Sequence, residues 1–126
     1  MEAAAQPEHL NQEGFDAFRQ RTDEEGPVVM LNLLRFRPDG GQQRYAEYAD
    51  AVAPCLEKVG GRIVFAGQPA APLLGDEGWD LVAVVEYPSR QAFLDMIASP
   101  EYTAIGHLRT EALERGELHP MDPAPI

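Results

Sequence analysis

The stretch VVMLNLLRFR, residues 28–37, is the clearest strand in the sequence and decides the fold. It is rich in β-branched and aliphatic side chains, and it ends at Pro38, where Asp39-Gly40-Gly41 predicts a turn. Both alternating sets of its side chains are largely apolar. That pattern is typical of a central strand that is covered on both faces, so we expect this stretch to lie inside a sheet.

Helices on either side of this strand are predicted by apolar residues that recur at steps of three and four, and by capping residues. The predicted helices are 10–21, 42–59, one that opens at Ser89, and one that runs from Ser99 to about Arg115. Pro54 should kink or shorten the second helix, and Gly60-Gly61 should end it. Gly116 should end the last helix.

Three further strands complete the predicted sheet. They are 62–67, 79–87 and a short fourth strand over 117–121, with a loop over 68–78. The order helix-β-α-β-β-α-β, with the second α split in two, is the split βαβ or ferredoxin-like pattern. We therefore expect one α+β domain over 1–126, with a four-stranded antiparallel sheet and helices on one face. Residues 1–27 form a helical extension in this interpretation, and 119–126 a loose tail.

A sheet with helices on one face leaves its other face bare. The strands over 28–37 and 79–87 are apolar on both faces, so the bare face needs a cover. A second copy of the chain is the simplest cover. The sequence therefore predicts a homodimer.

Charge and cysteine content restrict the partners and the compartment. The net charge is -11, from 10 basic and 21 acidic residues, which disfavours nucleic acid and anionic membranes as partners. The longest apolar run, Val28 to Leu34, is too short to span a bilayer. The N-terminal residues lack a signal-peptide pattern, and the single cysteine, Cys55, cannot form an internal disulfide. We expect a cytoplasmic protein.

Several stretches resemble a known family. They are VVMLNLLRFR at 28–37, YAEYADAVAPCLEKVGGRIVFAG at 45–67 and VAVVEYPSRQAFLDMIASPEYTAIGHLR at 82–109. With the E-Y-P-S turn and the S-P-E-Y helix opening, the chain resembles domain-of-unknown-function family 1330. The resemblance implies a ferredoxin-like dimeric α+β barrel related to antibiotic-biosynthesis-type monooxygenases, whose small pockets lie between sheet and helices. It implies no established catalytic residues.

Polar residues interrupt the apolar strand at two places. Asn32 is either a donor to a ligand carbonyl or oxyanion, or a structural bridge to a neighbouring strand or loop. Arg35 points to the opposite face of the strand. It either pairs with Glu86 on the neighbouring third strand, ends in solvent, or clamps an anionic ligand group.

The last predicted helix carries an arginine on its apolar side. Arg109 lies near the centre of the stripe that contains Tyr102, whereas His107 is nearly opposite and should be solvated. Arg109 is either a ligand contact or an inward-leaning arginine that pairs with a carboxylate or snorkels. His107 and Glu111 are four residues apart, but two ligands do not make a metal site, and we expect none. Tyr45, Tyr48, Tyr102 and Trp79 form either core and dimer contacts or a substrate cage.

No phosphate-binding loop, dinucleotide fingerprint or metalloprotease motif is present in the sequence. The leading hypothesis is a cofactor-independent enzyme, of oxygenase or isomerase type, that acts on a small organic molecule. Asn32 or Tyr102 would contact a proton or carbonyl, with Arg35, Glu86 or Arg109 as ligand contacts. The alternative is a non-catalytic small-molecule binding or dimerisation module. An enzyme should bring two or more of these five residues within hydrogen-bond reach.

Overall fold

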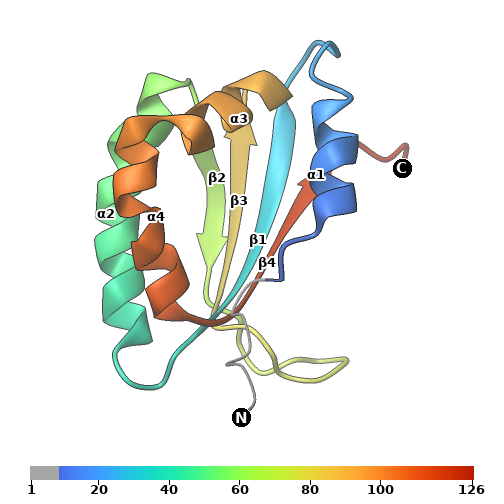
Figure 1. Ribbon diagram of the computed structural model, residues 1–126. Coiled ribbons are helices and arrows are strands. Elements are labelled where there is room, and N and C mark those ends of the chain that lie inside the picture. Colours follow the sequence, from blue (N-terminus) through green and yellow to red (C-terminus); the bar gives the residue numbers. More distant parts are fainter. Residues whose placement is uncertain (1–8) are drawn as a thin grey trace.

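The computed structural model describes residues 9–126, which form a sheet with helices packed against it (Figure 1). The elements in chain order are α1 (Gln12–Arg19), β1 (Val28–Phe36), α2 (Gly41–Lys58), β2 (Arg62–Gly67), β3 (Leu81–Tyr87), α3 (Arg90–Ala98), α4 (Pro100–Ala112) and β4 (Leu113–Met121). This order confirms the predicted ferredoxin-like pattern, including the split second helix. In this part of the chain, no helix is both long and apolar enough to cross a membrane.

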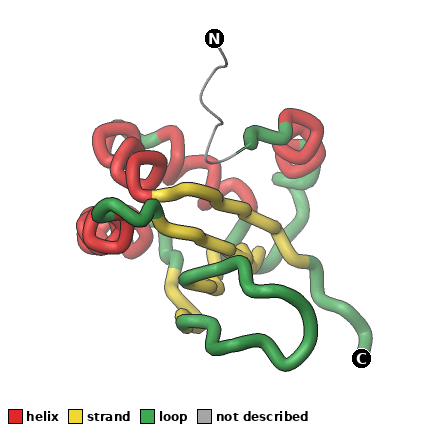
Figure 2. Tube along the Cα trace, turned by 90° about the horizontal axis from the view of Figure 1, so that it is seen from below, coloured by secondary structure: helices red, strands yellow, loops and turns green. Residues whose placement is uncertain are grey.

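The four strands form one antiparallel sheet in the order β2-β3-β1-β4. The stretch that predicted a central strand, β1, pairs with β3 on one side and β4 on the other, as its apolar character required. Figure 2 shows the helices gathered on one side of this sheet. The loop from 68 to 80 joins β2 to β3, and its Leu73 and Leu74 are 99% and 93% exposed.

The register of β1 against β3 separates the two faces of the sheet. The pairs Met30–Val85 and Asn32–Ala83 face the helices, and Met30 and Val85 belong to the main core with Phe18, Tyr48 and Phe93. The pairs Leu31–Val84 and Leu33–Val82 point to the opposite face, where they are only half-buried. We call this opposite side the open face. Its aliphatic centre agrees with the expectation that something must cover it.

The junction between α4 and β4 differs from the prediction. The helix ends at Ala112 and the strand starts at the next residue, so the predicted helix end at Gly116 and the strand start at 117 are wrong. Ala112 and Leu113 are fully buried with Leu34, and the carbonyl of Ala112 accepts a hydrogen bond from the Arg37 N–H at 2.9 Å. Packing and strand pairing therefore override the helical periodicity. Residues 119–121 belong to β4 and not to a loose tail.

The predicted helix caps are confirmed. The hydroxyl oxygens of Ser89 and Ser99 accept hydrogen bonds from the N–H groups of Ala92 and Tyr102, and Ser99 also ends α3. Gly60, with φ of +79°, ends α2 as expected.

Pro54 does not shorten its helix. It lies inside α2, and the helix continues past it to Lys58. Of the predicted third strand 79–87, the first two residues lie outside β3. One of them, Asp80, accepts a hydrogen bond from the Phe36 N–H at 2.8 Å and so ties the loop to β1.

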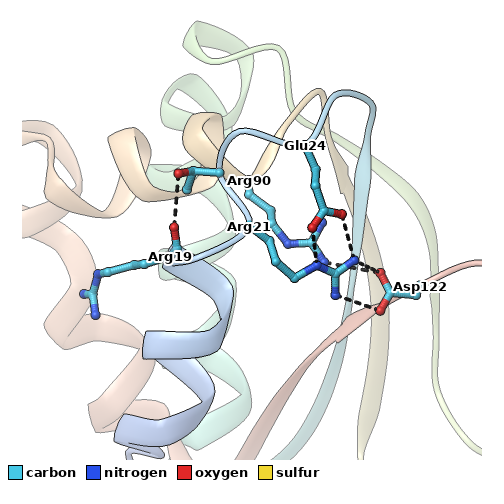
Figure 3. A network of polar contacts seen from close by, with 6 residues as sticks. Arg19, Arg21, Glu24, Arg90 and Asp122 are labelled. Carbon is cyan, nitrogen blue, oxygen red and sulfur yellow. Dashed lines mark hydrogen bonds and ion pairs between the residues drawn. The ribbon is translucent and has the colours of Figure 1, made fainter.

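An acidic residue just after β4 fixes the C-terminal segment to the body of the protein. Asp122 binds both Arg21 and Arg90 (Figure 3), with nitrogen–oxygen distances of 2.8 Å and 3.3 Å. Arg21 also binds Glu24, and the buried guanidinium of Arg90 lies 5.2 Å from the ring of Phe18. The contact therefore joins β4 to the segment after α1 and to α3.

Acidification should release this contact. The hydrogen bond from Arg21 and the nearby charges lower the pKa of Asp122 below its ordinary value of about 3.9. A carboxyl with a lowered folded pKa stabilises the fold above its unfolded pKa, and this contribution is lost as the pH falls through the folded pKa. We expect hydrogen exchange of residues 119–126 to rise, relative to the rest of the chain, below about pH 4. Asp122→Asn should show fast exchange in this segment already at neutral pH. Equal exchange in the two proteins at neutral pH would contradict the contact.

Candidate functional site

A cavity of about 1340 Å³ lies between the helix-facing side of the sheet and the helices. Its lining is predominantly apolar, and it draws residues from all four helices and all four strands. Five of the lining side chains carry the polar chemistry discussed below: Asn32, Tyr45, Tyr48, Tyr102 and Arg109. A concave apolar space with a few converging polar groups is the usual form of a small-molecule site.

Asn32 and Arg109 meet in this cavity. The Arg109 side chain comes from α4 and is buried, and its Nη2 donates to Oδ1 of Asn32 at 3.2 Å. On the other side, Nδ2 of Asn32 lies 3.4 Å from the carbonyl oxygen of Ala83 on β3 and 3.5 Å from that of Met30. These contacts turn the amide oxygen toward α4. Asn32 therefore bridges β1 to β3, as one of the two sequence interpretations proposed, and also orients the guanidinium.

Burial lowers the pKa of Arg109 to about 10. The side chain is still protonated at neutral pH, so the apolar cavity contains a positive charge. Such a charge interacts more strongly with an anion than it would in water, because the surroundings screen it less.

Three tyrosines line the cavity from α2 and α4. The hydroxyl oxygens of Tyr48 and Tyr102 lie 3.0 Å apart, and the rings of Tyr45 and Tyr48 are 5.4 Å apart. Burial raises the pKa of Tyr45 to about 12, and it also raises the pKa values of Tyr48 and Tyr102. All three hydroxyls are therefore protonated at neutral pH and can donate hydrogen bonds.

Arg35 and Glu86 lie on the open face, away from the cavity. Arg35 is exposed and binds Glu114 at 3.1 Å, while Glu86 binds Arg62 at 3.1 Å. Of the alternatives for Arg35, the pair with Glu86 is therefore wrong. The register explains the error, because Glu86 stands opposite Val29, and Arg35 is six residues farther along β1, about 20 Å away.

The remaining candidates lie outside the cavity. His107 is exposed, as expected, and forms a hydrogen-bonded pair with Glu111. Within residues 9–126, no group of three His, Cys, Asp or Glu side chains is arranged to hold a metal ion. Trp79 does not join the tyrosines, since its ring lies 4.7 Å from the guanidinium of Arg115.

Of the five candidates, the structure thus brings together Asn32 and Arg109, with Tyr102 in the same cavity. The hydrogen bond between Tyr48 and Tyr102 was not predicted. Tyr45 and Tyr48 are three residues apart on α2, so the sequence indicated a shared face. Nothing in the sequence indicated that α4 crosses that face at Tyr102.

The sheet order and the helix positions place the chain among ferredoxin-like α+β proteins. The model of the family described as "Domain of unknown function (DUF1330)" matches residues 40–118, and the chain belongs to this family. A protein of unknown function from Rhodopseudomonas palustris is 38% identical, with a TM-score of 0.84 over 94% of this chain and 97% of that one. The comparison with curated proteins gives no match.

More distant solved structures share the fold alone. A dimeric ferredoxin-like protein of unknown function from Jannaschia sp. CCS1 is 11% identical, with a TM-score of 0.65 over 78% of this chain and 100% of that one. A hydroxynitrile lyase from Passiflora edulis is 13% identical, with a TM-score of 0.61 over 81% of this chain and 99% of that one. The same architecture thus occurs in an enzyme and in proteins without an assigned activity.

Proposed function

We propose that this chain is a cofactor-independent enzyme, of oxygenase or isomerase type, that acts on a small organic molecule in the cavity between sheet and helices. The observation that carries the proposal is the buried Arg109 guanidinium, held by Asn32 at 3.2 Å in an apolar cavity. In both reaction types, negative charge develops on a substrate oxygen in the transition state. A fixed cation in a site of low polarity stabilises that charge without reorganising.

The tyrosine pair supplies the second element of the proposed site. Tyr48 and Tyr102 are protonated at neutral pH, since the ordinary pKa of tyrosine is about 10 and burial raises the pKa of both further. Their hydroxyls are 3.0 Å apart, so each can stabilise the other while one of them contacts the substrate. In this proposal Tyr102 donates a hydrogen bond to the substrate, and Tyr48 positions it.

The test first identifies a molecule that the purified protein retains in the cavity. This molecule is then incubated with fresh enzyme, and its products are analysed. Native mass spectrometry of the purified protein detects a bound molecule, which is then incubated with the enzyme under air and under argon. A product of unchanged mass under argon indicates an isomerase, and an oxygen-containing product formed only in air indicates an oxygenase. A molecule that is recovered unchanged in both cases would favour the non-catalytic alternative.

Loss of the Arg109 charge should then affect the chemical step. We expect Arg109→Gln to lower kcat by about 100-fold, the usual cost of removing one electrostatic stabiliser of a transition state. Arg35→Gln, on the open face, removes the same charge outside the cavity and should leave kcat unchanged. A normal kcat for Arg109→Gln would show that Arg109 has no role in the chemical step.

We further propose that the working form is a homodimer in which the open faces of two sheets meet. The open face presents the half-buried Leu31, Leu33, Val82 and Val84, beside Phe65, which is 60% exposed. Burial of such an apolar patch against a second copy is favourable, and two-fold pairing covers the patches of both copies at once. The single buried Cys55 supports a reducing compartment, and we propose the cytoplasm.

A charge at the centre of the open face should separate the dimer. Leu31 lies opposite Val84, so Leu31→Glu would bury two carboxylates in the proposed interface. We expect the wild type to have twice the chain mass of 13.9 kDa by light scattering, and the variant to have the chain mass. Leu74→Glu, in the exposed loop, is the control and should remain dimeric. A monomeric wild type would refute the pairing.

A further inference from the structure

We infer that the cavity binds an uncharged, ring-containing molecule through a carbonyl oxygen, which accepts hydrogen bonds from a cluster of tyrosine hydroxyls. This inference rests on the proposed function, because it specifies the substrate class of the same cavity. The cluster consists of the four tyrosines of the chain, which all line the cavity: Tyr45, Tyr48, Tyr87 and Tyr102. We call it the tyrosine cluster.

The tyrosine cluster is assembled from three elements. Tyr45 and Tyr48 lie on α2 and Tyr102 lies on α4, and these two helices are side by side (Figure 1). Tyr87 is the last residue of β3 and belongs to the main core. Burial raises the pKa of Tyr87, and the nearby hydroxyls of Tyr102 and Tyr45 raise it further, because charges on neighbouring oxygens would repel one another. The hydroxyls therefore share one region of the cavity.

The tyrosine cluster has more hydrogen-bond donors than internal partners. The hydroxyl oxygens of Tyr48 and Tyr102 lie 3.0 Å apart, and the hydrogen bond between them uses only one of their two hydrogens. Within residues 9–126, the hydroxyls of Tyr45 and Tyr87 have no hydrogen-bond partner, although Tyr87 is only 5% exposed. One hydrogen of the pair and one each from Tyr45 and Tyr87 are therefore available to a ligand. A ligand acceptor would satisfy these donors, which are costly to leave unpaired in an apolar surrounding.

These donors favour an uncharged acceptor. A carbonyl oxygen has two lone pairs and no hydrogen, so it can accept from two hydroxyls and brings no donor of its own that needs a partner. A carboxylate would lose its hydration in the predominantly apolar lining. The buried cation of the cavity, Arg109, is already engaged with Asn32 and in a further interaction. A neutral ketone therefore fits the tyrosine cluster better than an anion does.

The aromatic side chains around the tyrosine cluster favour a flat ring beside the carbonyl group. The ring centroids of Tyr87 and Phe93 lie 5.2 Å apart in edge-to-face geometry, and those of Tyr45 and Tyr48 lie 5.4 Å apart. Aromatic edges and faces of this kind attract a further ring. The cavity, at about 1340 Å³, has room for two fused rings. The ketone 2-acetylnaphthalene is therefore a suitable probe.

The test compares 2-acetylnaphthalene with 2-ethylnaphthalene by equilibrium dialysis at neutral pH. The two probes share the ring system and differ in that the ketone has a carbonyl group where the hydrocarbon has a methylene group. We expect the ketone to bind about fivefold or more tightly, which is the ratio that one net hydrogen bond implies. A carbonyl without donors would instead lose its hydrogen bonds to water, so equal or weaker binding of the ketone would overturn the inference.

Two variants then ask whether the hydroxyls make the contact. Tyr45→Phe and Tyr87→Phe each remove one hydroxyl and keep the ring. We expect at least one of them to bind acetylnaphthalene about fivefold more weakly, with the affinity for ethylnaphthalene unchanged. Both should have the thermal midpoint of the wild type or a higher one, because these hydroxyls have no partner to lose within residues 9–126.

Thr110→Val is the matched control, since it removes an exposed hydroxyl of α4 that does not line the cavity. The control should change neither affinity. If both phenylalanine variants bound acetylnaphthalene as tightly as the wild type, the tyrosine cluster would not be the carbonyl contact and the inference would be overturned.

Failure of this inference differs from failure of the proposed function. Turnover of a retained molecule, without binding of acetylnaphthalene, overturns the carbonyl contact and leaves the enzyme proposal standing. Hydroxyl-dependent binding of acetylnaphthalene, with no turnover of any retained molecule, supports the ligand class and overturns the enzyme proposal.

Discussion

Replacing Leu34 with alanine should lower the free energy of unfolding by about 3 kcal/mol. Leu34 is fully buried, and it packs with Ala112 and Leu113 at the junction of α4 and β4. The neighbouring Phe36, Tyr45 and Leu81 enclose the same cluster. The cost has two parts, the lost burial of the side chain and the cavity that the packed surroundings cannot fill.

Urea titration followed by far-UV circular dichroism measures this loss. Leu73→Ala is the matched control, because the same three carbons are removed from a side chain that is 99% exposed. The control should stay within about 0.5 kcal/mol of the wild type. A Leu34→Ala protein as stable as the control would show that the junction is not tightly packed. It would also weaken the placement of Arg109, which lies one turn before Ala112.

Gly41→Ala should destabilise the protein by about 2 kcal/mol or more, although alanine normally favours a helix. Gly41 is the first residue of α2, where a Cβ atom would lie 2.4 Å from the carbonyl oxygen of Ala112 and 3.1 Å from the backbone of Phe36. Those neighbours are backbone atoms, so a side-chain rotation cannot relieve the clash. The start of α2 would have to move away from the α4–β4 junction.

The thermal midpoint from differential scanning calorimetry, with the calorimetric enthalpy, checks this prediction. Gly78→Ala is the control, since nothing lies within 4 Å of its added Cβ atom. The control should match the wild type or exceed it slightly, because alanine restricts the unfolded chain. A stabilised Gly41→Ala protein would mean that α2 and the junction are separated more widely than we describe.

The fold was predictable because its signals are local. The apolar stretch at 28–37 identified the central strand, and the Ser-capped starts of α3 and α4 identified the split helix. The end of α4 was not predictable in the same way. Residues 113–116 continue a plausible helix, but the free edge of β1 offers hydrogen bonds to a strand, and Leu113 is fully buried only as part of β4.

The sequence identified residues of the candidate site only where a single side chain was unusual for the element that carries it. The polarity of Asn32 in an apolar strand, and of Arg109 on an apolar helix face, identified both residues, and the structure places them 3.2 Å apart. Arg35 and Glu86 were associated because their strands are neighbours, yet neighbouring strands do not fix a register. The observed register separates the two residues by most of the length of β1. Contacts between elements distant in sequence, such as Tyr48 with Tyr102, need the assembled fold.

The chain runs from Ser89 to Met121 without a loop, since Ser99 both ends α3 and starts α4, and β4 follows α4 at the next residue. An insertion in α4 before Arg109 would rotate Arg109 by about 100° per added residue relative to the start of the helix. The part of the loop before Asp80 has no helical phase to keep, and its Leu73 and Leu74 extend into solvent. Length differences among homologues should therefore accumulate between β2 and β3, and a fluorescent reporter could be grafted there while the geometry of the cavity is retained.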